Sequence, residues 1–282
     1  MPECPVCRRG AARPRWKVGA ARIDYCPGCQ AFIRRDAGPP GGSRAGDRFG
    51  TWWSGPGEGA TASLKAATAA WHLERLERVA YRGRLLDVGC GSGDLVRVAV
   101  ARGWEAEGLD LAPAAVVAAR EAGVKARLGP LSPEAVAGQR FDAVTLMDVL
   151  EHTQDPAALL ADVRRVLKPE GWLLLATPDA ASLSARLMGR WWPMWIPEHH
   201  VCFTRAGLVR LLERAGFEAA QAWTSLRAVS LAYLAAHLRH DPRPALAGLG
   251  RLLGQAVPVS IGAWAVRLPL GSCAVLARSH SA

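Results

Sequence analysis

Four cysteines near the N-terminus have the spacing of a metal site. Cys4, Cys7, Cys26 and Cys29 form two C-x2-C pairs separated by eighteen residues. Each pair places two thiolates on a tight turn, and two such turns complete a tetrahedral zinc site. Because the protein fills all four positions, the Zn²⁺ would be structural. The N-terminus lacks the apolar stretch of a signal peptide, so a disulfide framework is not indicated. We predict a zinc ribbon over residues 1–36.

A glycine-rich turn forms the second group. The run Leu85 to Val88 is apolar except for Asp87, and Gly89, Cys90, Gly91 and Gly93 follow it directly. Glycine permits positive φ and lets a ligand approach the backbone closely. A helical pattern begins at once, and the free N–H groups of a helix N-terminus favour an electronegative ligand. The pattern predicts a strand, a turn and a helix around a bound ligand. By itself it is shared by many nucleotide-binding folds.

Three histidines follow predicted strands. His152 comes after the apolar run 141–147, while His199 and His200 come after the run 172–177. Histidine is the natural general base near pH 7. We predict that His152 and one of His199 and His200 remove a proton or orient an acceptor. The structural alternative is that His152 braces its loop and His199 caps the next helix.

Three tryptophans, Trp191, Trp192 and Trp195, precede the second and third of these histidines. They suit a wall for a ring-shaped acceptor, an anchor at a membrane interface, or the packing of a lid. The sequence leaves these three interpretations open.

The elements that carry these residues alternate regularly. Strands are predicted at 85–88, 105–109, 124–128, 141–147 and 172–177, with helices at 61–82, 94–102, 113–122 and from 155 onward. Such alternation predicts an α/β fold with a doubly wound parallel sheet. Ligands bind such sheets beyond the carboxyl ends of the strands. Asp110 lies at one of these ends, where a carboxylate can accept hydrogen bonds from ribose hydroxyls.

Together these motifs resemble the class I S-adenosylmethionine (SAM)-dependent methyltransferases. The segments LLDVGCGSG, GLDLAP, FDAVTLMDVLEHTQDP and VLKPEGWLLLATP carry the resemblance, in family order, and residues 61–224 are covered. The resemblance implies a Rossmann-like, seven-stranded sheet with SAM as cofactor. It also implies a set of cofactor-binding residues. Asp87, Gly89, Cys90, Gly91 and Gly93 would bind the methionine part of SAM, and Asp110 would bind the ribose. Leu111 and Leu131 would contact the adenine, and Met147 would line the cofactor site.

A narrower resemblance concerns the acceptor. Glu151-His152 and the segment 197–204 are similar to small-molecule methyltransferases, including ubiquinone-type O-methyltransferases and sugar or polysaccharide-cluster enzymes. The expected acceptor is therefore a small or carrier-bound metabolite: a sugar, a quinone or a natural-product intermediate. Ribosomal RNA methyltransferases with a zinc ribbon compete, and imply RNA held by the ribbon and the basic ends. A non-catalytic SAM-binding scaffold is the third hypothesis, although Asp87 and Asp110 are both present.

Charge and composition suggest the layout of the chain. The net charge is +10, and the excess lies in residues 1–50, with ten basic and four acidic residues, and in 225–282, with six and one. Basic ends of this kind favour binding to nucleic acid, to an anionic membrane surface or to a phosphorylated substrate. We predict a linker or flap at 37–60 and a methyltransferase domain at 61–282 with a helical insertion at about 225–268. The expected location is cytoplasmic, peripheral membrane contact remains open, and oligomeric state is not indicated.

Overall fold

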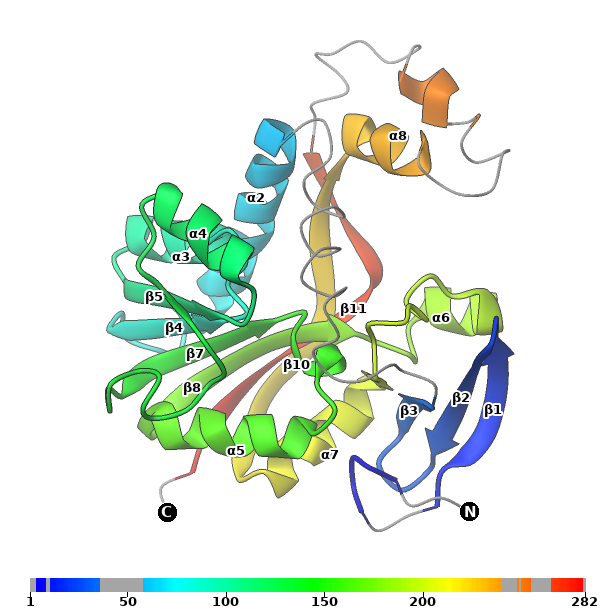
Figure 1. Cartoon of the computed structure of the whole chain (residues 1–282), viewed down its shortest axis with the longest axis horizontal. Helices are drawn as coiled ribbons and strands as arrows, with labels where there is room; N and C mark the ends of the chain where they lie inside the picture. The colour runs from blue at the N-terminus through cyan, green and yellow to red at the C-terminus, as the bar shows by residue number, and fades with distance from the viewer. Residues whose placement is uncertain are drawn as a thin grey trace.

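The computed structural model describes residues 4–8, 11–35, 58–239, 248, 250–254 and 265–280. Two β-sheets organise these residues, a large one of seven strands and a small one of four (Figure 1). The predicted flap at 37–60 lies outside the described residues except for its last three positions, where a helix begins.

The large sheet has the predicted α/β architecture. Its strand order is β10-β11-β8-β7-β4-β5-β6, in which β4 to β8 are parallel and β11 is antiparallel to both of its neighbours. The strands are β4 (Arg84–Val88), β5 (Glu105–Asp110), β6 (Ala126–Leu128), β7 (Phe141–Met147), β8 (Leu167–Pro178), β10 (Phe217–Ser230) and β11 (Ala265–Ser279). The seven-stranded, Rossmann-like fold expected from the sequence is confirmed.

Helices cover both faces of this sheet (Figure 1). One side carries α2 (Glu58–Leu76), α3 (Asp94–Ala101) and α4 (Pro113–Glu121), and the other carries α5 (Pro156–Val166) and α7 (Arg205–Arg214). Successive side chains of a strand point to opposite faces. Accordingly Leu85 packs in the cluster with α2 and α3, and Leu86 in the cluster with α5 and α7. Burial on both faces explains why the central strands are almost entirely apolar.

The connections beyond β7 and β8 hold shorter helices. A 3-10 turn, η1 (Leu150–His152), follows β7, and α6 (Leu183–Met188) with a second 3-10 turn, η2 (Gly189–Trp191), follows β8. No helix among the described residues is both long and apolar enough to cross a membrane.

The N-terminal residues form the small sheet. Its order is β1 (Arg13–Val18), β2 (Ala21–Cys26), β3 (Ala31–Arg34) and β9 (Val201–Phe203), all antiparallel. The last strand comes from the segment that follows His199 and His200. The sequence predicted a ribbon over residues 1–36 but not this fourth strand.

The predicted helical insertion at about 225–268 needs correction at both ends. Strand β10 continues to Ser230 and β11 already begins at Ala265. Between them the structure describes α8 (Leu231–Arg239) and a helical turn at 250–254. Helix α8 lies within the predicted insertion, whereas pairing with β11 holds 225–230 extended.

Candidate functional site

The glycine turn lies at the carboxyl end of β4, and its three glycines all have positive φ: 75° at Gly89, 53° at Gly91 and 79° at Gly93. A Cβ on Gly89 would lie 2.5 Å from a methyl carbon of Val149, and one on Gly93 would lie 2.7 Å from Val124. These two glycines are therefore required by packing. A Cβ on Gly91 would meet no atom within 4 Å, so this position faces open space that a ligand can occupy.

Asp110 ties the turn to the next strand. One carboxylate oxygen accepts a hydrogen bond from the Gly91 amide and the other accepts one from the Ala112 amide, both at 2.8 Å. A carboxylate oxygen can accept more than one bond, so both retain capacity for hydroxyl groups of a ligand. Leu111, the next residue, is 71% exposed. This pairing of a fixed carboxylate with an exposed apolar side chain suits a ribose and its attached base.

Asp87 lies beneath the turn. It is buried, and the Thr145 hydroxyl donates to it at 2.6 Å. Burial raises the pKa of Asp87 to about 7, and the charge of Asp110 acts in the same direction. A cationic ligand group beside Asp87 would favour its charged form.

The other predicted cofactor residues are more deeply placed. Cys90 is buried, burial raises the pKa of its thiol to about 12, and its sulfur lies 2.5 Å from where a Cβ on Gly108 would be. Its role is to fill space. Leu131 belongs to the large core cluster, whereas Met147 is half-buried at the end of β7. The turn, Asp110 and Leu111 together fit a SAM molecule, with Gly91 leaving room for it.

His152 and His199 come together, although 47 positions apart in the chain. Their ring centroids are 4.7 Å apart, with the rings nearly perpendicular. Nδ1 of His152 donates to the Glu198 carbonyl at 3.0 Å, and Nδ1 of His199 donates to the Met194 carbonyl at 2.8 Å. Because a carbonyl can only accept, each ring carries its proton on Nδ1 and a basic lone pair on Nε2. Burial lowers the pKa of both histidines, that of His199 to about 4.

His200 does not join this pair. Its amide donates to the Glu151 carbonyl at 2.8 Å, and its carbonyl accepts from the Arg34 amide at 2.9 Å. These bonds align the backbone and leave the ring half-buried beside the ribbon. Of the two adjacent histidines, His199 is therefore the better candidate for chemistry.

Glu151 is a site residue that sequence reasoning did not single out. It is fully buried; one carboxyl oxygen accepts from the Thr177 hydroxyl at 2.9 Å, and the other has no hydrogen-bond partner among the described residues. Burial raises the pKa of Glu151 to about 8, and the nearby charge of Asp148 adds to the effect. The sequence feature that could have identified Glu151 is its position beside His152, shortly after the strand β7.

An ion pair borders the same region. Asp148 has a φ of 55°, unusual outside glycine, and accepts two bonds from Arg227 at 2.5 and 2.6 Å. Backbone strain at the end of a central strand is common at functional sites. Sequence analysis did not identify this pair, because its members are 79 positions apart.

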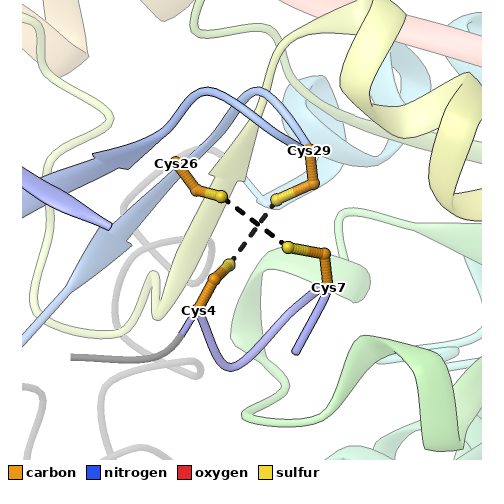
Figure 2. Close-up of side chains that lie close together, drawn as sticks. All are labelled: Cys4, Cys7, Cys26 and Cys29. Carbon is orange, nitrogen blue, oxygen red and sulfur yellow. Dashed lines mark hydrogen bonds between the residues drawn. The ribbon is translucent and has the colours of Figure 1, made fainter. Parts of the chain in front are cut away.

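Among the residues that the structure describes, two groups of side chains have the composition of a metal site: the four N-terminal cysteines, and Glu151 with His152 and His199. In each group the potential ligand atoms lie within 4.8 Å of one another. Figure 2 shows the four thiols pointing toward one centre. The sulfur of Cys4 is 3.6 Å from that of Cys29, and the sulfur of Cys7 is 3.7 Å from that of Cys26. These separations exclude disulfides and suit zinc, since Zn–S bonds of about 2.3 Å place sulfurs about 3.8 Å apart.

The three tryptophans before the histidines divide by environment. Trp192 and Trp195 are buried against the ribbon and α6, whereas Trp191 is 70% exposed. Leu183 and Leu187, on α6, are 73% and 78% exposed. Leu183 and Leu187 are one helical turn apart on α6, and Trp191 follows in the 3-10 turn η2. The Arg190 guanidinium lies 4.7 Å from the centre of the Trp191 ring.

Comparison with known proteins gives a consistent result. The sequence model of the methyltransferase domain family matches residues 62–222, more than half of the chain. The ubiquinone biosynthesis O-methyltransferase of Cereibacter sphaeroides (strain ATCC 17029) is 37% identical over 124 residues, which cover 41% of this chain and 50% of that protein. The chain thus spans about half the length of this relative. The protein of the same name from Xanthomonas axonopodis pv. citri is 33% identical over 186 residues, 59% of this chain and 75% of that protein.

Solved structures support the fold. A SAM-dependent methyltransferase from Archaeoglobus fulgidus superposes with a TM-score of 0.50 at 17% identity, covering 82% of this chain and 98% of that one. At this identity the likeness concerns the fold alone.

Proposed function

Because the chain belongs to the class I SAM-dependent methyltransferases, we propose that it transfers a methyl group from SAM to a hydroxyl of a small ring-shaped acceptor of the quinone type. The observation that carries the proposal is the group of Glu151 and His199, both buried, with the half-buried His152, beyond the ends of the strands of the sheet that also holds the glycine turn. Val149, three residues before His152, packs directly against Gly89 of that turn.

The residues have distinct tasks in this reaction. SAM, when bound by the turn and Asp110, supplies the electrophilic methyl group. His152 presents Nε2 as the base that removes the proton of the acceptor hydroxyl, and the Glu198 carbonyl fixes its tautomer. His199 packs edge-on against His152 and limits its rotation. Alignment of the acceptor in a site that excludes water supplies a large share of the rate.

The preference for a quinone-type acceptor has two supports. Both relatives described above are named for ubiquinone biosynthesis. The exposed side chains of Leu183, Leu187 and Trp191 precede the segment that carries His199, and exposed apolar residues suit contact with a lipid interface.

RNA is the second candidate acceptor. Arg13, Arg15 and Lys17 of β1 are exposed cations, and such residues suit phosphate contacts. A competition assay between the candidate acceptors tests the proposal. Purified protein with SAM is offered a hydroxylated benzoquinol, a nucleotide sugar and RNA, and products are identified by mass spectrometry. We expect one methyl group on a ring oxygen of the quinol. Methylated RNA, or methylated sugar alone, would overturn the proposal.

We also propose that the four cysteines hold one structural Zn²⁺. Four buried or half-buried thiols in tetrahedral reach of one another, in a unit of about thirty residues, need a metal to stabilise the fold. Elemental analysis of the purified chain is expected to give one zinc per chain, and Cys26→Ser should reduce it to well below one. Cys273→Ser, at a buried cysteine outside the ribbon, is the control and should retain full zinc. Metal-free wild-type protein of native stability would contradict this assignment.

A further inference from the structure

We infer that the metal ribbon positions the catalytic histidines: each of its two cysteine turns holds one of the two segments that bear His152 and His199. The inference rests on the proposed function and extends it, because it gives the N-terminal ribbon a task in the methyl-transfer site. The contacts on which it depends are backbone hydrogen bonds at the second cysteine turn and side-chain contacts at the first.

The second cysteine turn, which contains Cys26 and Cys29, holds the His199 segment. Strand β9 pairs with β3 through Ala31 with Phe203, Phe32 with Cys202 and Ile33 with Val201. The Arg34 amide continues this ladder to the His200 carbonyl, at 2.9 Å. His199 is therefore two residues from a strand that belongs to the ribbon sheet.

The same turn also fixes the start of α7. Gln30, directly after Cys29, accepts from the Thr204 amide at 3.2 Å through its carbonyl and from the Thr204 hydroxyl at 3.1 Å through its side chain. A Cβ on Gly207 would lie 2.3 Å from the carbonyl oxygen of Cys29. The first turn of the helix thus rests directly on the metal-binding turn.

The first cysteine turn, which contains Cys4 and Cys7, faces the His152 segment. Arg8 donates to Asp155 at 2.6 Å, three residues beyond His152. Cys4, Pro5 and Arg8 line one side of a recess whose other side is formed by Gln154 and Asp155. Beneath it, Cys4 and Val6 share the large core cluster with Leu150 of η1.

A metal joining the two turns therefore sets the separation between the two histidine segments. Zinc links the turns through short, directional bonds, whereas four unliganded thiols do not. The glycine turn, in contrast, has its own support in β4, β5 and the bond between Gly91 and Asp110, and its contact with the His152 segment is the packing of Val149 on Gly89. Loosening the ribbon is expected to disturb the histidines and to spare the cofactor.

The test changes the contact without touching a cysteine. In Gly207→Ala the added methyl group must push α7 away from the Cys29 carbonyl. Ala206→Ser, exposed on the same turn, is the matched control. We expect Gly207→Ala to retain zinc, to bind SAM within about twofold of wild type by calorimetry, and to lose about 10- to 100-fold in kcat, since a misplacement of about 1 Å can cost that much. Chelation of zinc from wild-type protein should produce the same pattern.

A second readout is independent of the acceptor. The imidazole signals of His152 and His199 in nuclear magnetic resonance spectra should shift in Gly207→Ala and on chelation, and should stay unchanged in Ala206→Ser. Unchanged signals would overturn the inference even if the acceptor proves not to be a quinol. Equal loss of SAM binding and kcat would overturn it too, because the ribbon would then support the whole domain.

Discussion

Replacing Asp110 by alanine is expected to weaken SAM binding about 100-fold. The carboxylate would accept two hydrogen bonds from ribose hydroxyls, and bonds to a charged group contribute about 1.5–3 kcal/mol each. The same carboxylate also accepts from the Gly91 and Ala112 amides, so its loss would release the turn from β5. Titration calorimetry with SAM measures the effect. Asp110→Asn, which keeps one acceptor oxygen, should lose about tenfold.

Asp162→Asn provides the control for removal of a negative charge. Asp162 lies on α5 and pairs with Arg165 at 3.1 Å, away from the turn. The dissociation constant of the Asp162→Asn variant for SAM should match that of wild type. If Asp110→Ala bound SAM as tightly as this control, the cofactor site would have to be sought elsewhere.

The central sheet could be predicted because its signals are local. The strand predicted at 141–147 is β7 with the same bounds, since an apolar run between a polar start and a polar end leaves little choice of register. Asp155 before Pro156 predicted the start of α5, and the Asp155 side chain does cap that helix by accepting from the Ala158 amide. Such features depend on neighbours within a few positions.

The remaining features depend on contacts between distant residues. Strand β9 is only three residues long and is extended because β3 offers it backbone partners from 170 positions away. The burial of Glu151 follows from Thr177 and the strands around it, and no local pattern distinguishes a buried glutamate from a surface one. The choice of His199 over His200 depends on which ring turns toward His152. One residue of offset in the strand that follows would exchange the two.

Replacing His152 by alanine is expected to lower kcat by about 100-fold or more while leaving SAM binding unchanged, because a positioned general base contributes about 10²–10⁴. His199→Ala should lower kcat about tenfold, since His199 orients His152 and does not itself need to take the proton. Initial rates at saturating SAM, with a separate SAM titration of each variant, measure both quantities. His200→Ala is the matched control and should keep kcat within about threefold of wild type.

The pH dependence of the reaction tests the same assignment. Burial lowers the pKa of His152 below 6.5 and that of His199 to about 4, so both rings are neutral near pH 7. Activity should therefore persist as pH falls to 6.5 and decline only below it, as the rings become protonated. The unfolded chain binds more protons than the folded one between pH 4 and 6.5, so the histidines' contribution to stability is present above pH 6.5 and declines as pH falls toward 4.

The pH profile distinguishes a general base at position 152 from a residue that only supports its loop. If His152 is the base, His152→Ala removes the inflection that marks the acid limb of the kcat/KM profile, and the small remaining activity rises steadily with hydroxide concentration. If His152 only supports the loop by its bond to the Glu198 carbonyl, the variant loses activity but keeps the wild-type limb. If the acid limb stayed unchanged in His152→Ala but was lost in His199→Ala, His199 would be the base and His152 the residue that orients it. An unchanged limb in both variants would contradict histidine catalysis and direct attention to Glu151, the remaining buried titratable group of the cluster.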